Sequence, residues 1–328
     1  MGSEARKRAR ERIREQREKE KRAAQRKKTL IVIGSAAAVV LLIVVVGYAI
    51  MTADRSDGYE GELAQETLQS DSSIVMAQPE AEAPVVEVYA DYQCPACRQF
   101  ENTNGDRLKE MAAEGEAIVQ LRPVSIFAMQ PTPTSSNSLR AGAAALAAAE
   151  QGVFVEYNDT LFANQPNSSE EGYTPDELKT WFQETSASED QAAGFDESVD
   201  TEAGVITEFT EEFMPALNQD AVAQIGEENL GTMTMPDLLA WGAQNGHDPS
   251  FLDGTHTGEI INATESAYTR YSGENMFRGT PAVYINGEQL DNDSAMSARG
   301  LRDAIEAAGA GEVESEPMEE EGDADPDP

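Results

Sequence analysis

Cys94 and Cys97 are the two cysteines of the 328-residue chain, and they enclose Pro95 and Ala96. An apolar, β-branched run at 85–90 precedes this Cys-Pro-Ala-Cys motif, and apolar residues with the spacing of a helix follow it. The first sulfur then lies at a helix N-terminus, where free N–H groups and the helix dipole favour a thiolate. Because a thiolate attacks disulfides and also leaves readily, the motif predicts thiol–disulfide exchange.

Three other interpretations of the cysteine pair are weaker. A structural disulfide would close a very short loop, and the stabilisation that a disulfide gives grows with the length of the loop. A zinc site needs two more ligands, and His247 and His256 are farther apart than the usual spacing of about three to five residues. Two buried, inert cysteines fit poorly beside a proline and the polar residues Arg98 and Gln99. The sequence therefore predicts no metal site.

The net charge of −36 combines two oppositely charged parts of the chain. Residues 1–28 contain 13 Lys and Arg against 5 Asp and Glu, whereas the remaining 300 residues contain 11 against 55. An acidic main body repels phosphate, so the composition argues against nucleic-acid binding by that part. Such acidity is found in proteins that face high salt and in secreted proteins generally, and composition alone does not separate these two explanations.

Residues 30–51 contain no charged side chain, and a helix of that length crosses the hydrocarbon core of a membrane. The basic segment 1–29 precedes this run, so we expect that segment in the cytoplasm and the rest of the chain outside it. The long apolar run without a small-residue cleavage site favours an uncleaved anchor over a signal peptide. The sequence thus predicts a single-pass protein of the cell membrane, with an acidic spacer at 52–80.

The rest of the chain predicts one α/β domain over residues 81–311. Strand, helix and strand within 85–124 form a βαβ unit with parallel strands, and 74–76 have the character of a short edge strand. Residues 184–233 are acidic with sparse apolar positions, which indicates weak helices or a solvent-facing insertion. Helices are predicted on both sides of this stretch, at 139–149, 153–162, 174–182, 236–242 and 260–271.

Strand character returns at 279–290, where Asn286 and Gly287 between apolar residues predict a hairpin. A last helix is expected over about 295–308. Residues 312–328 are rich in Glu, Asp and Pro, and this composition predicts a disordered acidic tail.

Three segments together resemble the thioredoxin superfamily and, within it, the bacterial DsbA-like thiol–disulfide oxidoreductases. They are Asp-Tyr-Gln-Cys-Pro-Ala-Cys at 91–97, Leu-Phe-Ala-Asn-Gln-Pro at 161–166, and Gly-Thr-Pro at 279–281 before the hairpin. A Cys-x-x-Cys motif alone is a weak match, whereas its combination with the distant Gly-Thr-Pro is strong. The resemblance covers about residues 81–309 and implies a thioredoxin fold with a helical domain inserted at about 135–272.

The resemblance also implies roles for single residues. Cys94 is expected to be the exposed nucleophile that forms a mixed disulfide with substrate, and Cys97 the more buried partner that resolves it. Pro95 and Ala96 complete the motif. The strongest oxidants of the superfamily have histidine in place of this alanine, so a less extreme reduction potential is expected here.

Thr280 and Pro281 match the family's cis-proline loop, which faces the cysteine motif and pairs with the substrate strand. Many relatives also have a buried acid on the first strand, often six residues before the nucleophile. Here that position is Val88, and the acid is Glu87. Strand alternation turns Glu87 to the opposite face unless a bulge corrects it, so Glu87 is only a candidate proton acceptor.

The implied function is dithiol–disulfide exchange outside the membrane, which forms disulfides in exported proteins that carry thiols. The resemblance implies no cofactor beyond the redox-active disulfide of Cys94 and Cys97, and reoxidation by a membrane quinone-linked oxidase of the DsbB or vitamin K epoxide reductase type. One alternative is an anchored disulfide reductase or isomerase, because the sequence does not give the reduction potential. The other is a non-catalytic, tethered binding module or chaperone.

Overall fold

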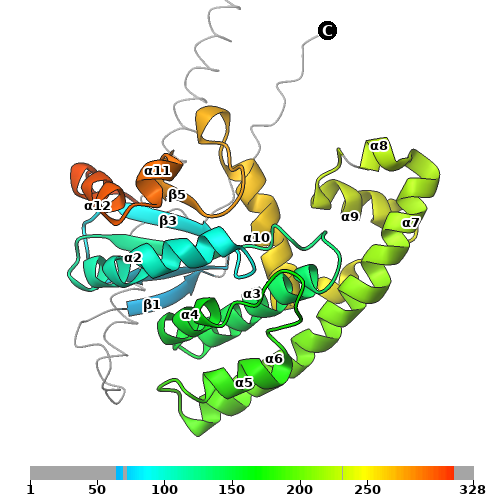
Figure 1. Ribbon diagram of the computed structural model, residues 1–328, viewed down its shortest axis with the longest axis horizontal. Coiled ribbons are helices and arrows are strands. Elements are labelled where there is room, and N and C mark those ends of the chain that lie inside the picture. The colour runs from blue at the N-terminus through cyan, green and yellow to red at the C-terminus, as the bar shows by residue number, and fades with distance from the viewer. Residues whose placement is uncertain (1–63, 69–71, 231, 314–328) are drawn as a thin grey trace, which may run out of the picture. The chain divides into compact units, whose positions relative to one another are not determined.

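The computed structural model describes residues 64–68, 72–230 and 232–313 (Figure 1). These residues belong to the second of two units into which the chain divides, residues 54–328. The predicted basic segment 1–29, the predicted membrane anchor 30–51 and nearly all of the predicted tail lie outside the described residues. Within the described ranges, no helix has the length and apolar character needed to span a membrane.

A six-stranded sheet in the order β1-β2-β4-β3-β5-β6 organises the described residues. β3 and β4 are parallel, as expected for a βαβ unit, and the other adjacent pairs are antiparallel. The strands are β1 (Ala64–Leu68), β2 (Ser73–Ala77), β3 (Val85–Ala90), β4 (Ile118–Pro123), β5 (Ala282–Ile285) and β6 (Glu288–Gln289). The strand that leads to the cysteine motif is therefore an inner one.

Two strands lie where the sequence indicated an acidic spacer at 52–80. β1 pairs with β2, and β2 pairs in turn with β4, so the sheet begins before the expected domain start at residue 81. β2 is an inner strand rather than the predicted edge strand. These predictions were wrong because the β1 sequence, Ala-Gln-Glu-Thr-Leu, is too polar to indicate a strand. β1 nevertheless pairs with β2 and so becomes the edge strand in its place.

The two faces of the sheet are covered by different helices. Alternate residues of β3 point to opposite faces, so Val86 and Val88 pack in the core with α2 and α12, while Tyr89 packs toward α10 (His256–Arg270). α2 (Pro95–Ala113) connects β3 to β4, and α12 (Ala298–Ala307) follows the short α11 (Asn292–Ala295) near the end of the chain. The predicted hairpin turn is present, with φ of 51° at Asn286 and 83° at Gly287.

The predicted helical insertion lies between β4 and β5. Its first helix, α3, is rich in alanine and packs against α6 and α10, because the small side chains allow close approach. At Gly142, a Cβ atom would lie 3.2 Å from the side chain of Ile260 on α10. The helices are α3 (Thr134–Glu150), α4 (Phe154–Ala163), α5 (Pro175–Phe182), α6 (Glu189–Thr207), α7 (Met214–Ile225), α8 (Glu227–Leu230), α9 (Met235–Gln244) and α10 (His256–Arg270).

The acidic stretch 184–233 is more ordered than its sequence indicated. α6 begins with a capping box between Ser188 and Gln191 and continues through a π-helical segment, Glu208–Phe213, into α7 (Figure 1). Phe195 and Phe209 are fully buried, and Phe195 stacks on Phe182 with ring centroids 3.9 Å apart. The sequence indicated weak helices or a solvent-facing insertion; helices are present and mostly exposed, but they are long and bury a narrow apolar face that the many acidic residues conceal in the sequence.

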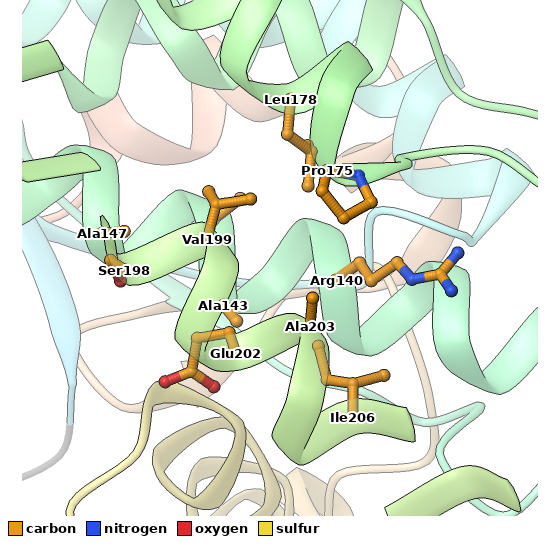
Figure 2. A pocket seen from close by; sticks show the side chains of 11 residues that line it. Arg140, Ala143, Ala147, Pro175, Leu178, Ser198, Val199, Glu202, Ala203 and Ile206 are labelled. Carbon is orange, nitrogen blue, oxygen red and sulfur yellow. The ribbon is translucent and has the colours of Figure 1, made fainter. Parts of the chain in front are cut away.

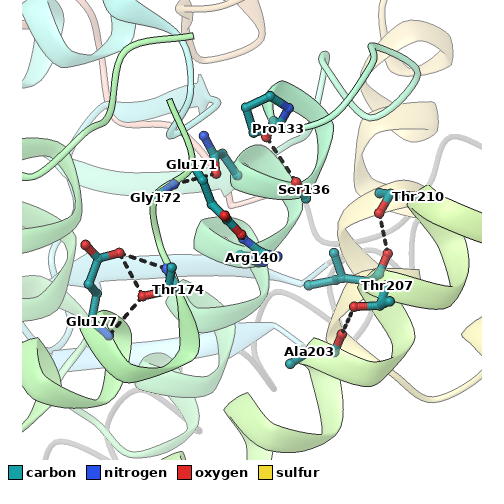
Figure 3. A network of polar contacts seen from close by, with 12 residues as sticks. Pro133, Ser136, Arg140, Glu171, Gly172, Thr174, Glu177, Ala203, Thr207 and Thr210 are labelled. Carbon is teal, nitrogen blue, oxygen red and sulfur yellow. Dashed lines mark hydrogen bonds and ion pairs between the residues drawn. The ribbon is translucent and has the colours of Figure 1, made fainter. Parts of the chain in front are cut away.

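A small pocket lies between the first helices of the insertion, and polar contacts are found nearby. Arg140 of α3, Leu178 of α5 and Val199 of α6 line the pocket (Figure 2). Arg140 also lies 3.3 Å from Glu171, and Figure 3 shows the capping box that Thr174 and Glu177 form at the start of α5. This packing holds the helical insertion together beside the sheet.

Candidate functional site

The cysteine motif lies where β3 passes into α2, as predicted. Cys94 is the N-cap residue of α2, and Pro95 is in its first turn, where a missing N–H leaves nothing unpaired. The carbonyl of Cys94 accepts hydrogen bonds from the N–H groups of Cys97 and Arg98, at 3.1 and 3.2 Å. The Cys94 sulfur therefore lies at the positive end of a helix of 19 residues.

Both cysteines are unbonded thiols in this structure. Cys94 has 6% of its surface exposed and Cys97 has 1%. Cys94 is the more accessible of the two, as expected, but it is not the exposed residue that the sequence predicted. The reason is tertiary, because the loop before β5 lies over the motif and brings the Thr280 carbonyl oxygen within 3.4 Å of the Cys94 sulfur.

The two thiols have opposite acid–base properties. The pKa of Cys94 is lowered to about 5, first by a hydrogen bond from the Cys97 thiol, and burial opposes this effect. The side chain of Thr280 and backbone N–H groups of α2 also contribute to this lowering. Burial raises the pKa of Cys97 well above its ordinary value. At neutral pH the pair therefore exists as a Cys94 thiolate and a Cys97 thiol.

The loop before β5 has the geometry that the resemblance implied. The bond between Thr280 and Pro281 is cis. β5 begins at the next residue, and Ala282 pairs with Tyr89 at the end of β3, which places the loop at the same edge of the sheet as Cys94. The Thr280 hydroxyl is buried and has no hydrogen-bond partner within the described ranges. The structure thus brings Thr280 together with the cysteine pair.

Replacing Thr280 with valine is expected to raise the pKa of Cys94 by about one unit, because the unpartnered Thr280 hydroxyl is then no longer there to donate to the Cys94 thiolate, and a hydrogen bond to a charged group is worth about 1.5 kcal/mol. The change keeps the shape of the side chain and removes its hydroxyl. Titration of the thiolate absorbance of the reduced protein measures this pKa. Thr269→Val, on the exposed surface of α10, is the matched control, and an equal shift in both variants would contradict the assignment to Thr280.

Glu87 does not lie beside the cysteines. Its carboxylate pairs with Arg122 at 2.7 Å, lies 3.8 Å from Arg270 and accepts a hydrogen bond from Tyr271. These groups are on the α10 side of the sheet, whereas Cys97 packs on the α2 side. No bulge interrupts the β3–β4 register, so strand alternation decides the orientation of Glu87. The candidate role of Glu87 as proton acceptor for Cys97 is therefore wrong.

Asp91 is a buried carboxyl group beside the motif that sequence reasoning quoted without a role. It is fully buried at the end of β3 and accepts hydrogen bonds from the Gln93 N–H and the Ser138 hydroxyl, each at 2.8 Å. Burial and, less strongly, the charge of Cys94 raise the pKa of Asp91 to about 7, although the hydrogen bonds from Gln93 and Ser138 act to lower it. In the sequence, only the position of Asp91 just before the motif pointed to a role. Its partner Ser138 lies on α3, far along the chain, so the contact could not be predicted.

Gln165 was also part of a quoted motif without an assigned role. Its side-chain amide donates hydrogen bonds to the carbonyls of Tyr92 and Cys94. Arg98 in turn donates to the Gln165 carbonyl at 3.2 Å, and the Tyr173 hydroxyl donates to the Tyr92 carbonyl at 3.0 Å. The helical insertion thus positions the turn that carries Cys94.

The described residues contain no group of three or more His, Cys, Asp or Glu side chains arranged to hold a metal ion. His247 lies 2.9 Å from Asp220, and His256 lies 3.2 Å from Glu259. Neither histidine therefore joins the cysteines in a common site.

Several solved structures are similar in fold. The thiol–disulfide oxidoreductase MdbA of Corynebacterium diphtheriae has 18% identity and a TM-score of 0.43, over 74% of this chain and 96% of that one. MdbA of Actinomyces oris has 14% identity and a TM-score of 0.48, over 74% and 90%. BdbD of Bacillus subtilis has 16% identity and a TM-score of 0.41, over 76% of this chain and 97% of that one. No curated protein matches the sequence.

A family model described as thioredoxin matches residues 70–307, which is most of the chain. The match begins between β1 and β2 and ends in α12, so it includes the cysteine motif, the helical insertion and the cis-proline loop. The predicted resemblance is confirmed, and the chain belongs to the thioredoxin family.

Proposed function

We propose that the protein is a membrane-tethered thiol–disulfide oxidoreductase that forms disulfide bonds in exported proteins. The observation that carries this proposal is the pairing of a Cys94 thiol of low pKa with a buried Cys97 thiol of high pKa. A stabilised Cys94 thiolate favours the reduced form of the pair, and this makes the disulfide form a stronger oxidant.

In the proposed reaction, the disulfide form of the pair accepts two electrons from a substrate dithiol. A substrate thiolate attacks the Cys94 sulfur, the bond between Cys94 and Cys97 breaks, and Cys97 takes up a proton. A second substrate thiolate then attacks the substrate sulfur of the mixed disulfide, and Cys94 leaves as a thiolate. The low pKa of Cys94 speeds this second step, because a weaker base is a better leaving group.

The substrate is proposed to bind along the cis-proline loop. Thr280 already places its carbonyl next to Cys94, and its backbone is proposed to pair with an extended substrate strand. The predicted anchor at 30–51 holds the domain near the membrane, where a quinone-linked oxidase of the DsbB or vitamin K epoxide reductase type would reoxidise it. The excess of basic residues in 1–28 supports an orientation with that segment in the cytoplasm and the domain outside it.

The reduction potential of the Cys94–Cys97 pair tests the direction of the reaction. The full-length protein in detergent is equilibrated against glutathione buffers, and the reduced fraction is measured by alkylation and mass. We expect a potential well above that of the thioredoxin pair, toward the value of about −120 mV found for the strongest oxidants. A value near about −270 mV would instead support an anchored reductase.

A further inference from the structure

The chain segments around Cys94 contain no acidic residue, although the domain as a whole is strongly acidic. Four segments adjoin this cysteine: 92–100 carry the motif, 124–138 lead from β4 into α3, 160–169 end α4, and 275–282 form the cis-proline loop. Their 42 residues contain no Asp and no Glu. The chain after residue 28 has 55 acidic residues among 300, a density at which 42 residues would contain about eight.

Hydrogen bonds hold these segments around Cys94. The Thr280 carbonyl oxygen lies 3.4 Å from the Cys94 sulfur, and the Gln165 amide donates to the Cys94 carbonyl at 3.0 Å. Ser138 donates to the carboxyl group of Asp91, at the end of β3, at 2.8 Å. The four segments therefore form one surface around the sulfur, which we call the Cys94 rim.

Burial does not explain why the rim lacks acidic residues. Many rim positions are exposed to solvent, where carboxylates are common in proteins. Uncharged side chains occupy these exposed positions, among them Gln99, Met129, Gln130, Asn164, Asn167 and Met276. The acid next to the motif, Asp91, is fully buried. The rim is therefore a surface from which negative charge is excluded.

Two arginines add positive charge to the rim. Arg98 follows Cys97 directly, and the exposed Arg278 lies two residues before Thr280. Neither guanidinium is in an ion pair within the part of the chain that the structure describes, although acidic residues outnumber basic ones five to one after residue 28. Arg98 donates one hydrogen bond, to the Gln165 carbonyl, and a guanidinium has five N–H donors. Both arginines can therefore pair with a carboxylate of a ligand.

Both arginines are close enough to Cys94 to act on a bound substrate. Arg98 is one turn of α2 beyond Cys94, about 6 Å along the helix axis. The Cα atom of Arg278 is at most about 7 Å from that of Thr280, because two residues separate them by no more in an extended chain. Charges in solution are screened over about 8 Å at physiological ionic strength. A substrate segment at Cys94 is thus exposed to the rim charges, while carboxylates farther away on the domain are largely screened.

From this arrangement we propose that the protein prefers substrate segments with Asp or Glu beside the reacting cysteine. The inference rests on the proposed exchange reaction and names its substrate class, acidic unfolded segments of exported polypeptides. Arg278 and Arg98 bind the substrate carboxylates, because a guanidinium can donate two parallel hydrogen bonds to one carboxylate. The acid-free rim avoids repulsion of the same segments. The net charge of the domain alone predicts the opposite, a preference for basic substrates.

The test uses three reduced peptides of equal length, each with two cysteines, flanked by Asp in one peptide, Ser in the second and Lys in the third. The oxidised full-length protein in detergent is mixed with each peptide, quenched with acid at successive times and analysed by intact mass. The two peptide thiols form a disulfide, and their two electrons open the Cys94–Cys97 bond. Cys97 takes up one proton, and the other enters the solvent.

Each rate is divided by the rate of the same peptide with hydroxyethyl disulfide, which is uncharged. This correction is needed because flanking carboxylates raise the pKa of a peptide thiol. In 0.15 M NaCl we expect the Asp peptide to react about five-fold faster than the Lys peptide, since two partly exposed ion pairs contribute modestly. In 1 M NaCl, where charges are screened over about 3 Å, the ratio should approach one.

Three variants show whether the rim causes this preference. Arg278→Gln should lower the ratio of the Asp rate to the Ser rate about 2- to 5-fold, because one ion pair with the substrate is lost. Met129→Glu adds a carboxylate at an exposed rim position and should lower the same ratio. Arg107→Gln is the matched control, because it removes one exposed positive charge from α2 about 20 Å beyond Cys94, and we expect the wild-type ratio.

The outcomes are distinct. A wild-type protein that oxidises the Lys peptide as fast as the Asp peptide, or faster, would overturn the proposed preference. An equal decrease in Arg278→Gln and Arg107→Gln would also overturn it, because net charge and not the rim would then decide the rate. Should Arg278→Gln not fold, the wild-type ratio and Met129→Glu decide. A wild-type protein that oxidises none of the three peptides would instead contradict the proposed exchange reaction itself.

Discussion

Replacing Cys94 with serine is expected to abolish thiol–disulfide exchange, with a loss on the order of 10³-fold or more, because a serine hydroxyl is not ionised at neutral pH and forms no disulfide. Cys97→Ser should behave differently. Its Cys94 keeps the position at the α2 N-terminus and the contact with Thr280, so it still attacks oxidised glutathione. The resulting mixed disulfide should persist, because the resolving thiol is missing.

Intact-mass measurement after mixing with oxidised glutathione separates the two variants. We expect no adduct with Cys94→Ser and a stable adduct with Cys97→Ser. The reverse pattern would mean that Cys97 is the nucleophile. In cells, a Cys94→Ser protein that still supplies the full wild-type phenotype would support the alternative of a tethered binding module or chaperone over catalysis.

Replacing Arg122 with methionine is expected to lower the free energy of unfolding by about 3 kcal/mol, because it leaves the Glu87 carboxylate buried without its nearest cation. The side chains of both residues are 5% exposed, and their charged atoms are 2.7 Å apart. Tyr271 and Arg270 still contact Glu87 in the variant, so we expect the lower end of the range for broken buried ion pairs. Denaturant unfolding of the reduced wild type and variant measures the difference.

Arg107→Met provides the matched control for this measurement. Arg107 pairs with Glu110 at 3.1 Å on the surface of α2, where the two side chains are 39% and 61% exposed. Exposed pairs of this kind contribute about 0–1 kcal/mol, because water and salt screen their charges. Equal losses in the two variants would show that burial of the Glu87 pair has no special effect on stability.

The local elements around the site were predictable because their signals are contiguous in sequence. The β-branched run before Cys94, the proline at the start of α2 and the Asn286-Gly287 turn each depend on a few adjacent residues. The parallel β3–β4 pair and the helical insertion between β4 and β5 were also predictable from such contiguous signals, and the structure confirms both. The burial of the apolar face of α6 was not predicted, because the helices that bury this face, α3 and α5, come from other parts of the chain.

The chemistry around Cys97 shows why the rest could not be predicted. Glu101 follows Cys97 on the same helix, and its sequence context is that of an ordinary helical glutamate. Its raised pKa comes from burial and then from the charge of Asp159, and its carboxylate accepts a hydrogen bond from Asn158; both of these residues belong to α4. Likewise, the sequence left the orientation of Glu87 conditional on a bulge, and only the unbroken register of β3 with β4 decided it.

By itself, the sequence determined the cysteine motif, the strand and helix that flank it and the relationship to the thioredoxin family, since these depend on residue type and short spacing. Tertiary structure alone decided that β1 and β2 extend the sheet, that Cys94 is covered by the Thr280 loop and that Glu87 pairs with Arg122 on the face of the sheet away from Cys97. The physical reason is that burial, hydrogen bonding and pKa arise from groups far apart in the chain, which only the packed fold brings into contact.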